Sequence, residues 1–435
     1  MTRRDRTGKV EFVGARESAR DGRFVALREP RYRTLFLSGM IIFLATHAQQ
    51  IARGWLAKEL TGSNAGLGGV YLAFGAAMGI ASIASGVVAD RFPKRTVLMI
   101  AQGLIMAGAL MIAIADSMGI LRYWMLVVAS VLHGAGMANM GPARISFTAE
   151  LVERRLLPNA IVLTQMSVNT TRILGPAIAG TLIGIKTIGT HGVYIITTSL
   201  CALSIYWTAR LPKIAPRAAA TAQRPLSSFT DGLHHVRARP RLAALVIVAN
   251  SIAIIGLPYV AFLPSIAKDI FDRGSGGFGL LSTFSAVAAL AMSFWIAGRV
   301  RVREMWFTQA WCGAAFGVGL LLLSIAPTFL WAIIAIFVLG ASSSGFQVAN
   351  NTLITTLAEH EYQGRVQALM MLGFSLSSMV ALPIGYLADR FGLRQSLAVM
   401  GSLCTATMAL YAMARPRIAA RAAMVGIAAP APATS

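Results

Sequence analysis

The chain has 435 residues, of which 56% are apolar and 13% charged, and its formal net charge is +22 at pH 7. This share of charged side chains is too small to cover the surface of a water-soluble protein of this length. Lipid is therefore expected to be the solvent for most of the surface of this chain. The positive charge alone would suit a nucleic-acid partner, but the long apolar runs leave no basic face, and no nucleic acid is expected.

The first 33 residues hold ten Lys or Arg and five acids but no apolar core, so they do not fit a secretory signal peptide. We interpret residues 1–33 as a basic cytoplasmic arm. The three cysteines lie beyond it inside apolar runs, and their odd number gives neither a disulfide framework nor metal-ligand spacing. They are predicted to be packing residues, and no metal is expected: Cys201, Cys312 and Cys404.

Apolar runs of membrane-spanning length follow the arm. A bilayer core about 30 Å thick requires about 20 apolar residues per helix. Such runs, bounded by charges, Gly or Pro, predict an all-α membrane protein with twelve transmembrane helices. The predicted spans are 34–57, 67–88, 96–115, 123–142, 161–184, 193–211, 242–266, 278–297, 305–325, 328–350, 366–388 and 396–414.

The basic residues predict how these spans are oriented. With the N-terminus inside, 30 of the 39 Lys and Arg fall in inner segments and eight in outer segments, with Arg53 counted at the outer end of the first helix and Arg172 within a span. Lys and Arg are enriched on the cytoplasmic side of membrane proteins. The asymmetry therefore predicts an even number of spans, with both termini cytoplasmic and residues 415–435 as a cytoplasmic tail.

A connection rich in Pro, Ala and Arg, residues 212–241, divides the spans into six and six. We interpret it as a cytoplasmic linker between an N-terminal six-helix bundle, residues 34–211, and a C-terminal six-helix bundle, residues 242–414. Five corresponding spans start 205 to 211 residues apart in the two halves. This spacing is typical of a duplicated six-helix unit, a 6+6 pseudo-repeat.

Several motifs carry a family resemblance. They are WLAKELTGSNAGLG from Trp55, GVVADRFPKR from Gly86, LLPNAIVLTQMSVNTTRILGPAIAG from Leu156 and GRVQAL from Gly364. With these motifs and the 6+6 arrangement, the chain resembles the major facilitator superfamily over residues 30–414. Within it, the chain is similar to the branch of bacterial efflux proteins that includes enterobactin exporters and macrolide exporters. The resemblance implies a monomeric, multi-pass secondary transporter of the cell inner membrane.

The motif GVVADRFPKR follows the second predicted span. Its glycine allows close helix approach, its aspartate can accept hydrogen bonds, and its basic residues fall at the depth of inner-leaflet phosphates: Gly86, Asp90, Arg91, Lys94 and Arg95. The resemblance implies that Asp90 and Arg91 latch the two bundles together at the cytoplasmic side in the outward-open state. The alternative is a turn with positive anchors, which any topology would carry.

A second stretch, GYLADRFGLR from Gly385, reads almost like the first. It starts 299 residues later, far from the 205 to 211 residues that separate the halves, and the span count places it on the outer side. The repeat instead pairs the first motif with GRVRVRE, Gly298 to Glu304. We interpret the likeness as coincidence or convergent turn chemistry, and we assign the latch to Asp90 and Arg91 alone.

The fifth predicted span carries the densest polar face in the membrane. Gln165, Asn169 and Arg172 follow each other at i, i+4 and i+7, which places them on one side of a helix. An arginine at the bilayer centre costs about 2.5 to 3.5 kcal/mol, so Arg172 should face protein or a water-filled cavity. It can contact substrate or a gate, which an anionic substrate would favour, or it can be a structural partner of neighbouring helices. A helix break is predicted further along this span, at Gly175, Pro176 and Gly180.

The resemblance implies that spans 1, 4, 7 and 10 line a central cavity. Isolated amides and hydroxyls often serve only helix packing. As a set with the polar face of span 5, however, they predict a polar and largely neutral substrate pocket. Its candidate lining residues are Gln50, Asn139, Gln165, Asn169, Arg172, Asn250, Tyr259, Gln347 and Asn350.

None of the 17 acids falls in the middle of a predicted span. Proton-coupled transporters commonly bury such a carboxylate. Coupling must therefore use His47, His133, Asp90 or an acid reached from a vestibule, or else another driving force. A lone histidine in a membrane is more often a packing residue. Protons as the coupling ion are therefore implied mainly by the resemblance.

Enzyme motifs are missing: the sequence contains no GxxxxGK[ST], no HExxH and no GxSxG, so no cofactor and no enzymatic activity are expected. We predict a secondary active transporter in contact with membrane lipids. It would export an amphipathic small molecule of the drug or siderophore type by alternating access, with proton antiport. The alternative within transport is an importer or facilitator of a small solute. The alternative of another class is a lipid-handling protein such as a scramblase, or a membrane enzyme.

Overall fold

Long helices make up nearly all of the structure, a computed structural model that describes residues 3–4, 10–11, 24–153, 155–185, 187–214, 233–297, 302–359 and 362–424. Two short strands, β1 (Arg3–Arg4) and β2 (Val10–Glu11), pair antiparallel near the N-terminus. A 3₁₀ turn, η1 (Val25–Arg28), then precedes the helices of the first half. These are α2 (Pro30–Thr61), α3 (Asn64–Arg91), α4 (Lys94–Ser117), α5 (Tyr123–Leu151), α6 (Leu157–Gly184) and α7 (Gly189–Ala209).

The second half begins with a helix that changes type along its length. α9 (Pro240–Gly256) is followed by a 3₁₀ segment, η2 (Leu257–Phe262), the short α10 (Leu263–Ser265) and a π segment, η3 (Ile266–Ile270). The predicted span 242–266 is therefore not one regular helix. Pro258 and Pro264 have no N–H to donate, so the α-helical hydrogen-bond pattern is interrupted there. The remaining helices are α11 (Gly274–Ala297), α12 (Val302–Ser324), α13 (Phe329–Leu357), α14 (Gln363–Phe391) and α15 (Leu393–Met424).

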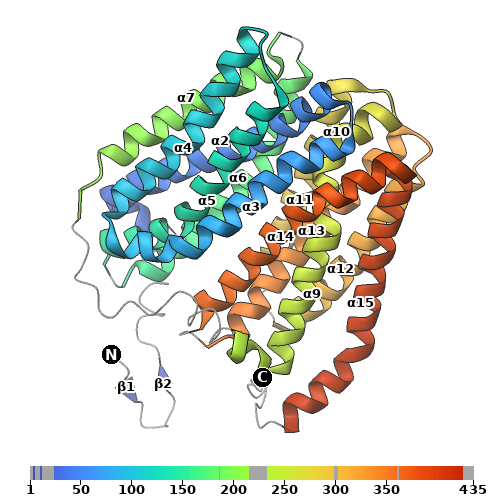
Figure 1. The fold of residues 1–435 in the computed structure, drawn as a ribbon. Coiled ribbons are helices and arrows are strands. Elements are labelled where there is room, and N and C mark those ends of the chain that lie inside the picture. Colours follow the sequence, from blue (N-terminus) through green and yellow to red (C-terminus); the bar gives the residue numbers. More distant parts are fainter. Residues whose placement is uncertain are drawn as a thin grey trace.

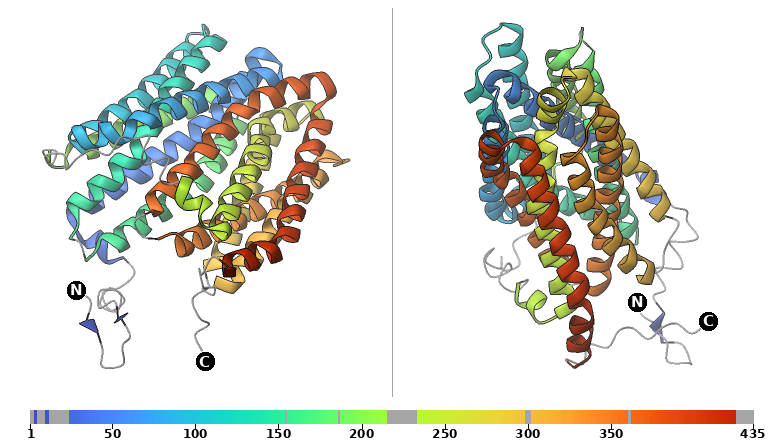
Figure 2. Two further views of the ribbon diagram at one scale, coloured as in Figure 1. Left: turned by 60° about the horizontal axis from the view of Figure 1, so that its bottom comes forward. Right: turned by 90° about the vertical axis from the view of Figure 1, so that its right-hand side faces the viewer.

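The helices form two bundles. Helices α2 to α7 pack on one another as the N-bundle, and α9 to α15 pack on one another as the C-bundle. The bundles meet mainly along two helix pairs, α3 with α14 and α6 with α11. Figure 1 shows them converging at one end and diverging toward the other, where α15 ends, and Figure 2 gives two further views. We call the end where α2 begins and α15 ends the terminal end, and the opposite end the far end.

The connection between α2 and α3 fixes the start of α3 at the far end. Gly62 ends α2 in the left-handed conformation, with φ 66°, which a residue without Cβ adopts readily. Ser63 is the N-cap of α3, and its side chain accepts a hydrogen bond from the Gly66 N–H at 2.9 Å. The first two N–H groups of α3, those of Asn64 and Ala65, remain for a partner outside the helix.

The outer faces of the helices are apolar. Large side chains such as Phe294, Phe307 and Trp311 are 76%, 65% and 62% exposed, and a water-soluble protein rarely exposes many such groups together. Eleven helical segments of the described chain are long and apolar enough to cross a membrane. The 28-residue α6 is not one of them, because its amide, hydroxyl and arginine side chains lower its hydropathy. The chain is a multi-pass membrane protein, as predicted.

The helices extend beyond the predicted spans. Because a helix rises about 1.5 Å per residue, the 28 residues of α3 reach about 42 Å, more than the apolar bilayer core. α2 begins at Pro30, inside the predicted arm 1–33, and α15 continues to Met424, inside the predicted tail 415–435. Most of the predicted linker 212–241 lies outside the described residues.

The predicted helix break in α6 is wrong. The helix is continuous, with Pro176 in its interior, because one missing N–H inside a transmembrane helix can be compensated by neighbouring groups. The two glycines instead allow close packing. A Cβ on Gly175 would lie 2.6 Å from the His47 Cβ, and one on Gly180 would lie 2.9 Å from the Ser282 Cβ. Gly175 therefore lets α2 approach, and Gly180 lets α11 approach.

Two arginines that the charge count placed at the membrane surface are buried in the N-bundle. Arg53 and Arg144 are each 3% exposed. Arg144 donates a hydrogen bond to the Leu35 carbonyl at 2.8 Å, and Gly39 leaves room for its guanidinium. Arg53 donates to the His133 Nδ1 at 3.1 Å. Without these two residues, the predicted inner segments still hold most of the basic side chains.

Candidate functional site

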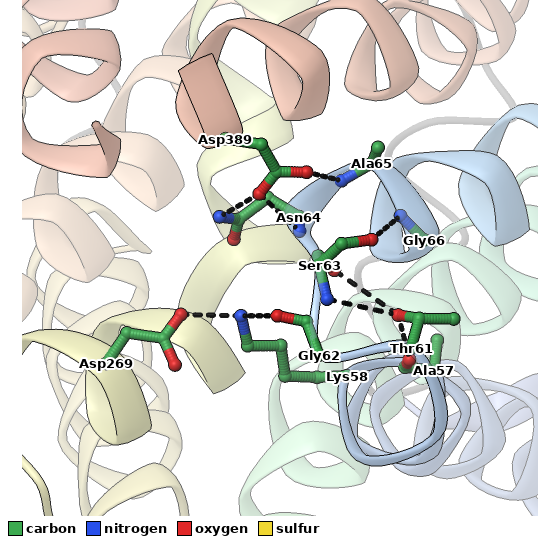
Figure 3. A network of polar contacts seen from close by, with 10 residues as sticks. All are labelled: Ala57, Lys58, Thr61, Gly62, Ser63, Asn64, Ala65, Gly66, Asp269 and Asp389. Atoms are coloured by element: carbon green, nitrogen blue, oxygen red, sulfur yellow. Dashed lines mark hydrogen bonds and ion pairs between the residues drawn. The ribbon is translucent and has the colours of Figure 1, made fainter. Parts of the chain in front are cut away.

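A carboxylate of the C-bundle caps a helix of the N-bundle at the far end (Figure 3). Asp389, in the last turn of α14, accepts hydrogen bonds from the Asn64 N–H at 2.8 Å, the Asn64 Nδ2 at 2.8 Å and the Ala65 N–H at 2.9 Å. The first N–H groups of a helix have no partner within the helix, and the helix dipole favours negative charge there. Asp389 therefore supplies from the other bundle what a local cap leaves unsatisfied.

An ion pair joins the bundles at the same end. The Lys58 Nζ, in the last turn of α2, lies 2.5 Å from the Asp269 Oδ2 in η3, and it also donates to the Gly62 carbonyl at 2.9 Å (Figure 3). The Lys58 side chain is 4% exposed and that of Asp269 is 40% exposed. We call this pair and the Asp389 cap together the far-end clamp.

Glycines bring α3 and α14 into close contact below the clamp. A Cβ on Gly385, one turn before Asp389, would lie 2.4 Å from the Asn64 carbonyl oxygen. A Cβ on Gly68 would lie 2.4 Å from the Ala381 carbonyl oxygen. Neither position can hold a side chain without a backbone shift. The two helices therefore form a small-residue seam, a common way for membrane helices to pack.

A second seam joins α6 and α11. A Cβ on Gly180 would lie 3.2 Å from the Gly279 Cα, and the Thr181 and Thr283 hydroxyls are 3.2 Å apart. Toward the far end, the Trp55 ring of α2 stacks on the Phe278 ring of α11, with ring centroids 5.4 Å apart. The far halves of the bundles are thus held by two seams, aromatic stacking and the clamp.

Arg172 contacts the C-bundle near the middle of the molecule. It lies 15 residues into α6, about 22 Å from the start of the helix. Its Nη1 donates to the Gln347 Oε1 of α13 at 2.7 Å, and its guanidinium carbon lies 5.3 Å from the centre of the Phe374 ring of α14. His47 of α2 lies close enough to interact with it electrostatically. The structure therefore brings together the predicted residues Arg172 and Gln347, with His47 nearby.

Polar faces extend from this contact toward the terminal end. Gln165 and Asn169 share a helix face with Arg172, and both are exposed. On α13, Asn351 and Thr355 follow Gln347 at i+4 and i+8, and both are exposed. Because Arg172 touches Gln347, the two faces confront each other there. Nearer the terminal end, the side chains of both faces are exposed.

The other five predicted lining residues lie outside this contact. Asn139 and Asn250 are half-buried, and each donates to a carbonyl of its own helix, at 3.0 Å and 2.9 Å. Tyr259 is 3% exposed and packs on Phe316, and Asn350 is 4% exposed and accepts from Gln309 Nε2 at 3.3 Å. The last two belong to the C-bundle core. Gln50 is half-buried on α2.

The two histidines considered for proton coupling have different environments. His47 Nδ1 lies 2.7 Å from the Phe43 carbonyl oxygen, which can only accept, so this nitrogen carries the hydrogen. His133 is 3% exposed, and its Nδ1 accepts from Arg53. Its ring also meets the Phe74 ring edge-on, with centroids 5.3 Å apart. His133 is thus enclosed by the N-bundle, whereas His47 lies near the contact between the bundles.

The first GxxxDRFxxR motif lies at the terminal end, across the end of α3 and the start of α4. The surroundings of Gly86 and the side chain of Asp90 lie outside the described part of the structure. Arg91 is exposed. Lys94 is buried and lies 3.7 Å from a Glu150 carboxylate oxygen, and Arg95 donates to the Leu211 carbonyl at 3.0 Å. Lys94 and Arg95 thus contact the N-bundle itself. Lys94 was predicted to lie at the depth of the lipid phosphates, but it is buried and is not available to them.

The interpretation of the second motif as coincidence needs correction. Its Asp389 joins the two bundles, whereas the sequence interpretation assigned that role to Asp90 and Arg91 alone. Sequence reasoning also missed Lys58, Asp269 and Asn64. The sequence does contain a signal: an acid at the end of an apolar span can cap the start of a neighbouring helix, and the repeated ADRF places such an acid at the ends of both α3 and α14.

Comparisons with known proteins agree with this architecture. The family model described as Major Facilitator Superfamily matches residues 35–382. A staphyloferrin A transporter of Staphylococcus aureus is 22% identical, with 86% of this chain and 94% of that protein covered. Macrolide efflux protein A of Streptococcus pyogenes is 21% identical, with 86% and 93% covered. An enterobactin exporter of Shigella flexneri is 24% identical, with 66% and 73% covered.

Solved structures show the same fold at low sequence identity. A POT family transporter in complex with 5-aminolevulinic acid has a TM-score of 0.66 and 13% identity, with 89% of this chain and 96% of that chain covered. A mutant form of a nucleoside transporter has a TM-score of 0.67 and 13% identity, with 88% of this chain and 99% of that chain covered. Two bundles joined through α3–α14 and α6–α11, together with the family match over most of the chain, establish that this protein belongs to the major facilitator superfamily.

Proposed function

We propose that the protein is a secondary active exporter of amphipathic small molecules that works by alternating access. One observation carries the proposal: the bundles are clamped at the far end, while the polar faces of α6 and α13 are exposed toward the terminal end. A transporter of this kind exposes a midplane site to one side at a time. The macrolide efflux protein and the enterobactin exporter among the relatives support export.

The protein is proposed to lie in the inner membrane, with its terminal end facing the cytoplasm. The excess of Lys and Arg in the predicted inner segments supports this orientation. α6 is proposed as the twelfth span: it lies between α2 and α11, and its polar face meets the other bundle rather than lipid. The conformation described above is then the inward-open one, with residues 215–232 within the cytoplasmic linker.

The two ADRF motifs are proposed to act as alternating latches. α3 and α14 pack along each other, and each carries its aspartate 26 residues after its first residue, 90 − 64 in α3 and 389 − 363 in α14. In the inward-open conformation, Asp389 caps the start of α3. When the terminal end closes, Asp90 would reach the start of α14 in the same way, with Arg91 beside it. The spacing of 299 residues between the motifs equals the spacing between these two helix starts.

The driving force is proposed to be a proton gradient. His47 lies near the contact between the bundles, so its protonation could respond to movement there, whereas His133 is enclosed by the N-bundle. Measuring export before and after adding a protonophore tests this step. Unchanged export after the gradient collapses would exclude proton antiport.

Everted membrane vesicles test direction and mechanism together. An exporter accumulates its substrate inside such vesicles, whereas an importer or facilitator does not concentrate it there. A panel of macrolides and siderophores provides candidate substrates. In a variant with Asn64→Cys and Asp389→Cys, oxidation to a disulfide should stop accumulation and reduction should restore it. Accumulation that continues with the pair oxidised would exclude alternating access at the far end.

A further inference from the structure

The guanidinium of Arg172 carries a charge that no carboxylate balances within the described ranges of the chain. Its contacts there are the Gln347 amide oxygen and the Phe374 ring face. By contrast, Lys58 of the clamp has an acidic partner in Asp269. His47, the titratable neighbour of Arg172, can add positive charge but not negative charge.

The uncompensated charge requires a physical reason. Placing a cation between membrane helices without a counter-charge is unfavourable, so a residue that served only to join α6 to α13 would be better uncharged. A guanidinium offers five N–H donors in a planar fork that fits both oxygens of one carboxylate. Gln347 satisfies Nη1 with a single neutral oxygen. A negatively charged acceptor in place of this oxygen would bind the guanidinium more strongly.

We propose that the contact formed by Arg172, Gln347 and Phe374 is the binding site for the carboxylate of an amphipathic organic anion. The inference rests on the proposed transport function and specifies its substrate class. The carboxylate displaces the Gln347 oxygen from the guanidinium, and an apolar or aromatic part of the ligand packs on Phe374. Gln165 and Asn169 extend the polar contacts toward the terminal end, from which the ligand enters.

Gln347 is placed to release the guanidinium when the ligand arrives. Its amide nitrogen lies 3.4 Å from the Ser343 Oγ, so the side chain keeps a partner on its own helix after Arg172 turns to the ligand. Ligand binding thereby replaces a direct contact between the bundles with one through the ligand. Arg172 and Phe374 lie on opposite bundles, so the anion would contact both.

Equilibrium binding to the purified full-length protein tests the proposal without requiring transport. The probes are dansylglycine, dansylphenylalanine and dansyltryptophan, each compared with its primary amide, so that each pair differs only in the carboxylate. Dansyl fluorescence reports binding. In at least one pair, the carboxylate should bind about tenfold more tightly than the amide, as expected for a charge-assisted hydrogen bond to guanidinium. Equal or weaker binding of the carboxylate in all three pairs overturns the proposal.

Three variants identify the charge responsible. Arg172→Gln should abolish the carboxylate preference, and Arg172→Lys should keep part of it because the charge remains. Gln347→Glu should also abolish it, because a tethered carboxylate then neutralises Arg172. Arg210→Gln is the control: it removes an exposed arginine at the C-terminal end of α7 and should leave the preference unchanged. A preference that survives both Arg172→Gln and Gln347→Glu overturns the proposal.

Anionic lipid is the other source of a negative group. Phosphatidylglycerol is added as a competitor in the same assay, and the proposal expects it not to displace the carboxylate probe. One-to-one displacement would assign the site to a lipid phosphate instead. Failure of this inference and failure of the proposed function are distinguishable. Vesicle export of compounds without a carboxylate preference refutes only the substrate class, whereas carboxylate binding without vesicle transport refutes only the exporter.

Discussion

Removing the far-end clamp should shift the protein toward a conformation that is open at the far end. Replacing a helix-capping aspartate by alanine costs about 1 kcal/mol, and an ion pair with one exposed partner contributes up to about 1 kcal/mol. At about 1.4 kcal/mol per factor of ten, Asp389→Ala and Asp269→Asn should each change the conformational ratio roughly fivefold. The double variant should change it roughly 30-fold if the two effects add.

Distances between spin labels at Met118 and Ile325 measure this ratio. Both positions lie at the far end, on different bundles, and are 64% and 72% exposed, while the three native cysteines are buried. A starting ratio of about 99 to 1 would become about 20 to 1 in either single variant and about 3 to 1 in the double variant. The double variant should therefore show a new population of longer distances.

Asp116→Asn is the matched control for the clamp. It removes the same charge at the same end, but Asp116 accepts from Thr190 at 3.5 Å, within the N-bundle. Its distance distribution should equal that of the unaltered protein. If the double variant also gave that distribution, the clamp could not be what holds the far ends together.

Further predictions concern the other latch, the seam and the orientation. Asp90→Asn should lower vesicle export roughly tenfold, the effect of losing about 1.4 kcal/mol of latch energy, without lowering the amount of protein in the membrane; unchanged export at normal expression would contradict the latch. Gly180→Leu should overpack the α6–α11 seam by about 1 to 3 kcal/mol and lengthen the far-end label distances; unchanged distances would show that the seam can absorb a side chain. With Arg91→Cys and Arg390→Cys tested separately in intact cells, a membrane-impermeant thiol reagent should label only the second, and labelling of both from outside would overturn the orientation.

Local composition was sufficient to predict most helices. Each predicted span overlaps a helix or, for residues 242–266, a series of helical segments, because about 20 apolar residues in lipid can satisfy their backbone only as a helix. Helix continuity was less predictable. Pro176 and its flanking glycines indicated a break, yet the helix continues, because the glycines respond to neighbours on α2 and α11 that a local pattern does not reveal.

The contacts between bundles could not be predicted from spacing. Asp389 and Asn64 are separated by 325 residues, and neither lies in a pattern that names the other. Arg53 and Arg144 show the same limit, because a count of positive charges treats them as surface anchors, whereas tertiary packing buries both. The polar face of α6 was predictable, since helical periodicity alone aligns Gln165, Asn169 and Arg172. Its partner Gln347 was predicted as a lining residue but not as the acceptor for Arg172.

The glycine seam between α3 and α14 has a consequence for kinetics. Large interdigitated side chains must change rotamer before two helices can separate, which raises the barrier to separation. Gly68 and Gly385 present only backbone to the opposite helix, so little must rearrange as the seam opens. The lifetime of the closed far end should then depend on how often the few polar contacts at its rim break together. Substitutions at that rim should change the rate of opening, whereas larger residues in the seam should chiefly prevent closure.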